Sequence, residues 1–290
     1  MDDTCNIPLA SAGQILYEND GSGWRSIYHR SVATGAKGLL VGDGAGNLVI
    51  AGDTGGNGAC DVVLVKENGE ASCIWTGMEF AASAAVAAGS DVLLLGRYTD
   101  AQTATKLVKY DGKSWTEIGS WPWPDVIPTT VATAGSTVVV AGGGQLAWAG
   151  DIASGSLTQL PKVPAGDYTA AWIYGLNDVY LGNAIGQMVH YDGAQWTTQE
   201  TGLDQVVRIW ASGDHTLFAY SAMQLVRIEG GISKSIWRFD GDASQSAIVM
   251  DMWGNASTEL FLAVKDFAFS KYACGPTFLL WFDGSSVHRF

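Results

Sequence analysis

A pair of apolar residues recurs six times along this chain, and the recurrence restricts the folds that the chain can adopt. In each pair, the first residue lies seven positions before the first apolar residue of a run rich in β-formers. The pairs are Val41 and Leu48, Ala85 and Val92, Val131 and Val138, Trp172 and Val179, Trp210 and Leu217, and Trp253 and Leu260. They follow one another at intervals of roughly 40 residues, which is the length of one four-stranded propeller blade. The repeat therefore predicts an all-β fold, a β-propeller of four-stranded antiparallel blades.

Turns that contain glycine recur in phase with these pairs. Their glycines are Gly21, Gly69, Gly112, Gly155, Gly193, Gly231 and Gly284. Three of the turns are nearly the same string, YDGKSW at 110–115, YDGAQW at 191–196 and FDGSSV at 282–287. Asp-Gly between two apolar runs is typical of a tight β-hairpin, because both residues tolerate left-handed conformations. The alternation sets Tyr110 and Trp115 on one face, where we expect the rings to fill the space between neighbouring blades.

The two signals differ in the number of blades that they predict. Seven turns favour seven blades, whereas six apolar pairs leave six blades and an extra terminal hairpin as the alternative. We expect a single β-propeller domain over 1–290, in which 1–13 complete or staple the first blade. The Ala-rich segment 79–85 has helical propensity, but its place in the repeat predicts an inner strand.

One repeat unit has a close counterpart in a known family. The strings NDVYLG at 177–182 and GQMVHYDG at 186–193, followed by Trp196, resemble the repeat unit of secreted bacterial β-propeller proteins. Trp210 and Trp253 fit the same template. The resemblance implies an exported protein located outside the cell, in the periplasm or on the cell surface. The residues that carry it are structural, so it implies a fold and not an activity.

Charge and hydropathy exclude some partners. The chain has a net charge of −13, and only 16% of its 290 residues are charged. Nucleic acids and anionic membranes attract Lys and Arg, so neither is expected as a partner. No segment reaches the ~18 consecutive apolar residues of a membrane span. Residues 1–4 lack the parts of a signal peptide, which favours a start placed where a removed export signal or lipoprotein anchor ended. We expect a monomer.

The four cysteines, Cys5, Cys60, Cys73 and Cys274, are candidates for disulfides. Their even number and the lack of a C-x-x-C pair favour disulfides in an oxidising compartment over a zinc site, with buried free thiols as the alternative. Cys5 and Cys274 flank the expected ring closure. Cys60 and Cys73 share a hairpin, but its turn sets them about four residues out of register, roughly 13 Å along the strand. A bridge between them requires a bulge, and the connectivity stays open.

The histidines do not form a recognisable catalytic or metal site. No two of His29, His190, His215 and His288 lie at metal-ligand spacing, and the chain has no G-x-S-x-G elbow. His190 is expected to be a blade-packing or surface residue. A glycosidase requires a pair of carboxylates, and the sequence gives no pair to prefer. A lactonase-like propeller requires converging metal ligands, and the sequence does not identify them either.

Two Gly-rich loops contain weak candidates for Ca²⁺ ligands. These are Asp43 and Asn47 in one loop and Asp53 and Asn57 in the other. Calcium takes six to eight oxygens, and the loops lack a third carboxylate and a bidentate Glu. Turn formation explains the same residues, because Asp and Asn hydrogen-bond their own backbone. No cofactor is therefore expected.

The string WPWP at 121–124 is the most unusual segment of the chain. Proline stiffness could hold Trp121 and Trp123 as a flat platform for a sugar or a peptide, and burial over the core is the alternative. Our leading hypothesis is an exported, non-catalytic binding or adhesion module that recognises a glycan or a protein through loops on one face. A propeller hydrolase or lyase with a channel site and a structural spacer in a surface assembly are the alternatives.

Overall fold

The computed structural model describes residues 13–19, 24–31, 38–42, 46–52, 60–66, 68–76, 80–98, 104–122, 127–239, 247–266 and 277–289. Every helix or strand assigned in these ranges is a β-strand, which confirms the all-β prediction. No helix in the described ranges is long and apolar enough to cross a membrane.

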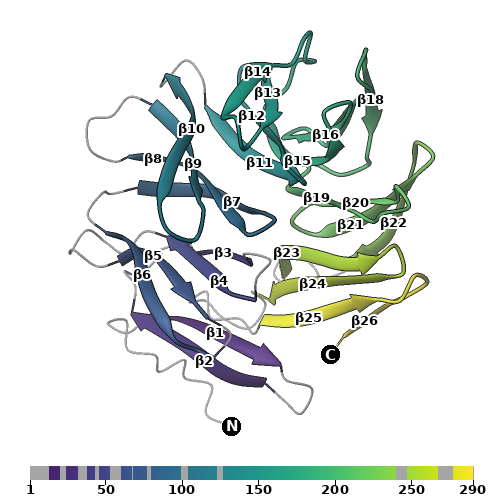
Figure 1. The fold of residues 1–290 in the computed structure, drawn as a ribbon. Coiled ribbons are helices and arrows are strands. Elements are labelled where there is room, and N and C mark those ends of the chain that lie inside the picture. The colour runs from purple at the N-terminus through teal and green to yellow at the C-terminus, as the bar shows by residue number, and fades with distance from the viewer. Residues whose placement is uncertain are drawn as a thin grey trace. The chain divides into compact units, whose positions relative to one another are not determined.

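The described strands form six four-stranded sheets and one two-stranded hairpin, each sheet being a simple meander (Figure 1). The six sheets are the blades of a β-propeller, numbered 1 to 6 here in chain order. This arrangement is the one expected from six blades and an extra terminal hairpin. Residues 1–12, which were expected to complete or staple a first blade, lie outside the described residues.

The chain divides into two compact units, which are described separately. The first comprises Met1–Val138 and Gly150–Thr158. Its hairpin contains β1 (Gly13–Asn19) and β2 (Trp24–Ser31). Its first two blades contain β3 (Gly38–Gly42), β4 (Leu48–Gly52), β5 (Cys60–Val65), β6 (Ala71–Thr76), β7 (Phe80–Ala88), β8 (Asp91–Tyr98), β9 (Ala104–Tyr110) and β10 (Trp115–Pro122).

Blade 3 contributes residues to both units, and its strands are β11 (Pro128–Ala134), β12 (Thr137–Gly142), β13 (Leu146–Asp151) and β14 (Ser156–Gln159). The second unit comprises Val139–Ala149 and Gln159–Phe290. Its blades 4 and 5 contain β15 (Tyr168–Gly175), β16 (Asp178–Asn183), β17 (Gln187–Tyr191), β18 (Trp196–Glu200), β19 (Arg208–Ala211), β20 (Leu217–Tyr220), β21 (Gln224–Glu229) and β22 (Ile232–Arg238). Blade 6 contains β23 (Ala247–Ala256), β24 (Glu259–Asp266), β25 (Thr277–Phe282) and β26 (Val287–Arg289).

The first strand of each blade contacts the first strand of the next within a unit. In the first unit β7 contacts β3 and β11, and in the second unit β19 contacts β15 and β23. Small side chains suit such crowded positions, and β7 consists mainly of alanine. The inner strand that the repeat predicts for the Ala-rich segment is therefore confirmed over helical propensity.

The Asp-Gly turns are closed by their own aspartates. The Asp192 Oδ1 atom accepts the backbone N–H groups of Ala194 and Gln195 at 2.9 and 2.8 Å. Asp111 and Asp283 make the same pair of contacts in blades 2 and 6. The glycine that follows each aspartate has φ near 90° (88°, 92° and 92°), where a side chain would be strained. These backbone N–H bonds hold the pKa of all three carboxyls below the usual range.

The aromatic pair beside these turns joins blades together. Trp115 lies opposite Tyr110, with ring centroids 5.0 Å apart, and its Nε1–H donates to the carbonyl oxygen of Ile74 in blade 1 at 2.8 Å. In the second unit, Trp196 pairs with Tyr191 in the same way, and its Nε1–H donates to the Pro161 carbonyl ahead of blade 4 at 2.8 Å. The predicted role of this pair in packing between blades is confirmed.

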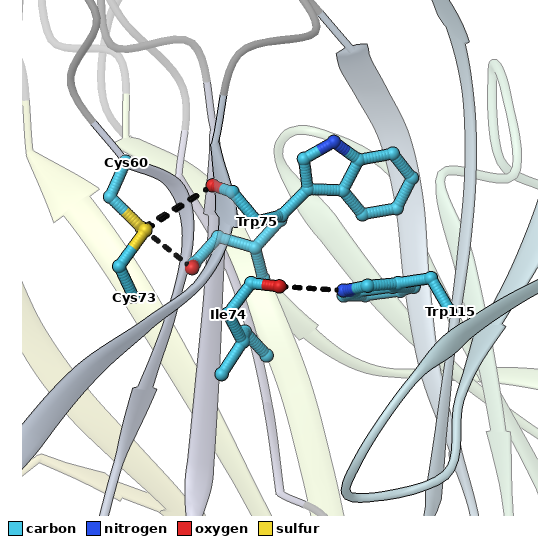
Figure 2. The surroundings of a disulfide bond; sticks show 6 residues. Cys60, Cys73, Ile74, Trp75 and Trp115 are labelled. Carbon is cyan, nitrogen blue, oxygen red and sulfur yellow. Dashed lines mark hydrogen bonds between the residues drawn. A yellow bond between two sulfur atoms is a disulfide. The ribbon is translucent and has the colours of Figure 1, made fainter.

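A disulfide joins Cys60 of β5 to Cys73 of β6, with their Cα atoms 5.6 Å apart (Figure 2). Two register shifts, between Cys60 and Val62 and between Val62 and Val63, supply the irregularity that the bridge requires. Cys60 is paired with Thr76 rather than with the expected Gly77. Figure 2 also shows the Trp115 indole directed at the Ile74 carbonyl next to the disulfide. Cys5 and Cys274 lie outside the described residues.

Candidate functional site

Most of the candidate residues from the sequence lie outside the described residues. Trp121 is only 5% exposed, so its indole belongs to the packed interior and not to an open platform. Trp123 lies outside the described residues, as do the calcium candidates Asp43, Asp53 and Asn57. Of that set Asn47 alone is described. Among the described residues, no three His, Cys, Asp or Glu side chains are arranged to hold a metal ion.

Blade 5 departs from the aromatic pattern of blades 2 and 4. In those blades the tyrosine opposite the second strand pairs with a tryptophan of the outer strand. In blade 5, Leu217 of the second strand pairs with Ile228 of the third strand, and Ile228 pairs with Ser233 of the outer strand. The hairpin is also shorter, since Gly230 and Gly231 alone connect its two strands. Blade 5 therefore presents a branched aliphatic residue and a small polar residue where blades 2 and 4 present two large rings.

A pocket of about 310 Å³ lies between blades 4 and 5, within the second unit. Its floor consists of Met188, Leu217 and Ile228, which are 2%, 5% and 1% exposed and belong to one apolar cluster. The rest of its lining is Tyr180, His190, Thr197 and Gln199 from blade 4 and His215, Gly230 and Gly231 from blade 5. Because Ile228 stands where a tyrosine stands in blades 2 and 4, we attribute the pocket to the departure of blade 5 from the repeat.

The wall that blade 4 contributes follows from strand pairing. Tyr180, His190 and Thr197 are paired across β16, β17 and β18, so they form one row on the face that looks toward blade 5. Gln199 pairs with Met188 two residues further along the same face. Its Nε2 atom is buried and has no hydrogen-bond partner among the described residues. A buried amide donor without an acceptor is costly, which marks this end of the pocket as a place for an acceptor atom.

Asp178, the first residue of β16, holds both histidines at the rim. His190 Nε2 lies 2.8 Å from Asp178 Oδ1, and His215 Nδ1 lies 3.6 Å from Asp178 Oδ2. The His190 ring stacks on Tyr180 with centroids 4.1 Å apart and planes 6° apart. His215 lies against the ring of Tyr174 at the same centroid distance. A carboxylate can only accept, so the His190 Nε2 atom carries a proton, and the Nδ1 atom of a neutral His190 ring is an acceptor.

The two tyrosines behind the histidines stay protonated over the whole physiological range. Burial, with the Asp178 charge adding to it, raises the pKa of Tyr174 to about 12. Burial, followed by the Asp178 charge, also raises the pKa of Tyr180. The Tyr174 hydroxyl donates to the backbone carbonyl of Ser212 at 2.6 Å, which ties blade 4 to the loop that presents His215.

Part of the Asp178 cluster is a structural feature of the repeat. In blade 2 the first residue of the second strand is Asp91, and its Oδ2 lies 3.5 Å from the Nζ of Lys109 on the third strand. Asp178 and His190 occupy the same two positions in blade 4. The ion-pair geometry is therefore shared, whereas the second histidine, the stacked ring and the pocket belong to the interface between blades 4 and 5.

The sequence matches no protein-family profile, and it matches no curated protein sequence. The structure is similar to solved structures. One, titled "YCF48 bound to D1 peptide", aligns with a TM-score of 0.60 and 12% identity, over 89% of this chain and 82% of that chain. Another, titled "Crystal Structure of Mitotic Checkpoint Complex", aligns with a TM-score of 0.61 and 8% identity, over 87% and 75% of the two chains. At these identities the likeness supports the β-propeller fold and nothing finer.

Proposed function

We propose that this chain is a non-catalytic binding module that holds a segment of a partner protein in the pocket between blades 4 and 5. The observation that carries the proposal is the replacement of the Tyr–Trp pair by Ile228 and Ser233. It leaves a concave, partly apolar site of about 310 Å³, within the size range of ligand pockets.

The lining favours a peptide over a sugar. Three buried apolar side chains, Met188, Leu217 and Ile228, form the floor, and every sugar hydroxyl placed against them would lose a hydrogen bond to water. A peptide side chain with an apolar body suits such a floor, and polar groups at the rim can bind its backbone. The titles of the two solved structures name a bound peptide and a mitotic checkpoint complex, which supports protein as the ligand class.

An exported location is part of the same proposal. The Cys60–Cys73 disulfide supports it, because disulfides form and persist in oxidising compartments. The resemblance of the repeat unit to secreted bacterial β-propeller proteins points in the same direction. A net charge of −13 favours solubility and disfavours acidic partners.

Selection of displayed random peptides on the immobilised protein tests the proposal. The blocking variant is Thr197→Trp, because Thr197 lines the pocket and is exposed, so a large ring there closes the opening with little cost to folding. The matched control is Thr198→Trp, an exposed neighbour that is not part of the lining.

We expect peptides that bind the wild-type chain and the control at equal levels and bind the blocked variant at least tenfold more weakly. Equal binding to all three chains would show that the pocket is not the site. A glycan-array signal that Thr197→Trp abolishes, with no peptide enrichment, would replace peptide by sugar as the ligand.

A further inference from the structure

We propose that the residue recognised in this pocket is a tyrosine of the partner peptide, held by its neutral phenol group. This inference deepens the proposed function and rests on it. Three features of the pocket lead to it: the space that the repeat leaves unfilled, the unpartnered amide donor of Gln199, and the acidic character of the rim.

The space is that of an aromatic side chain. In blade 4 the corresponding register positions hold Tyr191 and Trp196, whose ring centroids are 5.0 Å apart. Blade 5 supplies only Ile228 and Ser233 at these positions. An incoming ring would lie on the apolar floor and beside the stacked rings of Tyr180 and His190, an environment that aromatic groups prefer.

The polar groups distinguish among aromatic residues. The buried Gln199 Nε2 needs an acceptor, which a phenol oxygen provides and an indole N–H or a phenyl ring does not. The phenol hydroxyl can in turn donate to an unprotonated imidazole nitrogen of His190, whose Nε2 faces Asp178. Tyrosine therefore matches the site better than tryptophan or phenylalanine.

The charges at the rim favour a neutral ligand group. The Asp178 carboxylate lies between the two histidines, so a carboxylate or phosphate placed there would face a like charge. The same carboxylate disfavours ionisation of a bound phenol, as it does for Tyr180. An unmodified tyrosine is thus expected to bind, and its phosphorylated form is not.

Imidazole resonances report directly on this site. The chain contains four histidines, so the ¹H–¹³C spectrum of the imidazole groups is simple to assign. His190 and His215 line the pocket, while His288 of β26 is not among the lining residues and serves as an internal control. The probes are N-acetyltyrosinamide, N-acetylphenylalaninamide and N-acetylleucinamide, each titrated into the full chain.

We expect N-acetyltyrosinamide to shift the His190 and His215 signals and to bind about fivefold to tenfold more tightly than the phenylalanine probe, the equivalent of one hydrogen bond. The leucine probe should bind more weakly than both. Gln199→Leu keeps the side-chain volume and removes the donor, so it should abolish the preference for tyrosine over phenylalanine while the phenylalanine probe still binds.

Two different blocking variants are tested, so that the experiment still gives a result if one of them fails to fold. Thr197→Trp closes the pocket at its rim. Ile228→Tyr fills it from the floor with the tyrosine that blades 2 and 4 have at this position. Both variants should abolish the shifts of the His190 and His215 signals that N-acetyltyrosinamide causes. Equal affinities of the three probes, or a tyrosine preference that persists in Gln199→Leu, would overturn the inference. Displayed peptides that depend on the pocket but lack tyrosine would also overturn it while leaving the proposed function intact, whereas binding that Thr197→Trp does not affect would overturn both.

Discussion

The disulfide in blade 1 should stabilise that blade by an amount that the geometry allows us to work out. Cys60 and Cys73 are separated by 13 positions, and closing a loop of that size removes chain entropy from the unfolded state equivalent to about 3 kcal/mol at 25 °C. Cys73 is exposed and Cys60 is half-buried, so replacing both by alanine leaves little cavity to add to this figure. The double variant should therefore lose about 3 kcal/mol of unfolding free energy.

Hydrogen exchange at increasing urea, read by mass spectrometry on peptides that cover β5 and β6, measures this loss locally. Reduction of the wild-type chain should produce the same change as the double variant, because both remove the same cross-link. The effect should extend to blade 2, since β6 supplies the Ile74 carbonyl that accepts the Trp115 indole N–H. Unchanged exchange in β5 and β6 after the loss of the bridge would refute the reasoning, and it would mean that the sheet register alone holds this hairpin.

Three further predictions concern the second unit. Trp196→Phe keeps an aromatic ring of smaller size and removes the N–H donor to Pro161, so it should cost about 1–2 kcal/mol in urea unfolding, and a loss of more than about 4 kcal/mol would contradict this assignment. Burial raises the pKa of Tyr168 and Tyr220 to about 12, so the stability that their neutral forms contribute is complete below pH 10 and should fall as pH rises from about 10 to 12. A tyrosinate absorbance step completed near pH 10 with the fold intact would exclude this effect. Asp192→Ala removes the acceptor of the turn amides and should speed their hydrogen exchange, whereas Asp192→Asn should preserve their protection.

The repeat made the blades predictable because it is a property of local sequence. Asp-Gly turns specify hairpins through their own backbone preferences, and the period of roughly 40 residues identifies one blade. The pairing of Tyr110 with Trp115 followed from alternation alone. The Ala-rich strand was also predictable, because its place in the repeat outweighed its helical propensity.

Other features depend on irregularities that a single sequence does not reveal. The bulges that bring Cys60 and Cys73 together cannot be read from residue spacing. The sequence left two environments open for Trp121, an exposed platform and burial over the core, and the fold buries it. His190 and His215 lie on different blades, so their common contact with Asp178 requires the tertiary structure.

The pocket itself did leave a signal in the sequence. The turn at Gly230 and Gly231 lacks the aspartate and the aromatic flanks of the turns in blades 2 and 4, so the departure of blade 5 was visible. Reading it as a cavity required knowing which face of β21 and β22 looks toward blade 4. That direction became clear only from the register and from the cluster that Ile228 shares with Met188.

The bond between Trp196 and Pro161 affects how this protein can be divided for experiments. The acceptor precedes the first strand of blade 4, which begins at Tyr168. A fragment designed to start at that strand would discard the acceptor and leave the outer tryptophan unanchored. Expression boundaries should therefore be drawn ahead of Pro161 and not at the sheet edge, because blade 4 is fastened by a length of chain that comes before it.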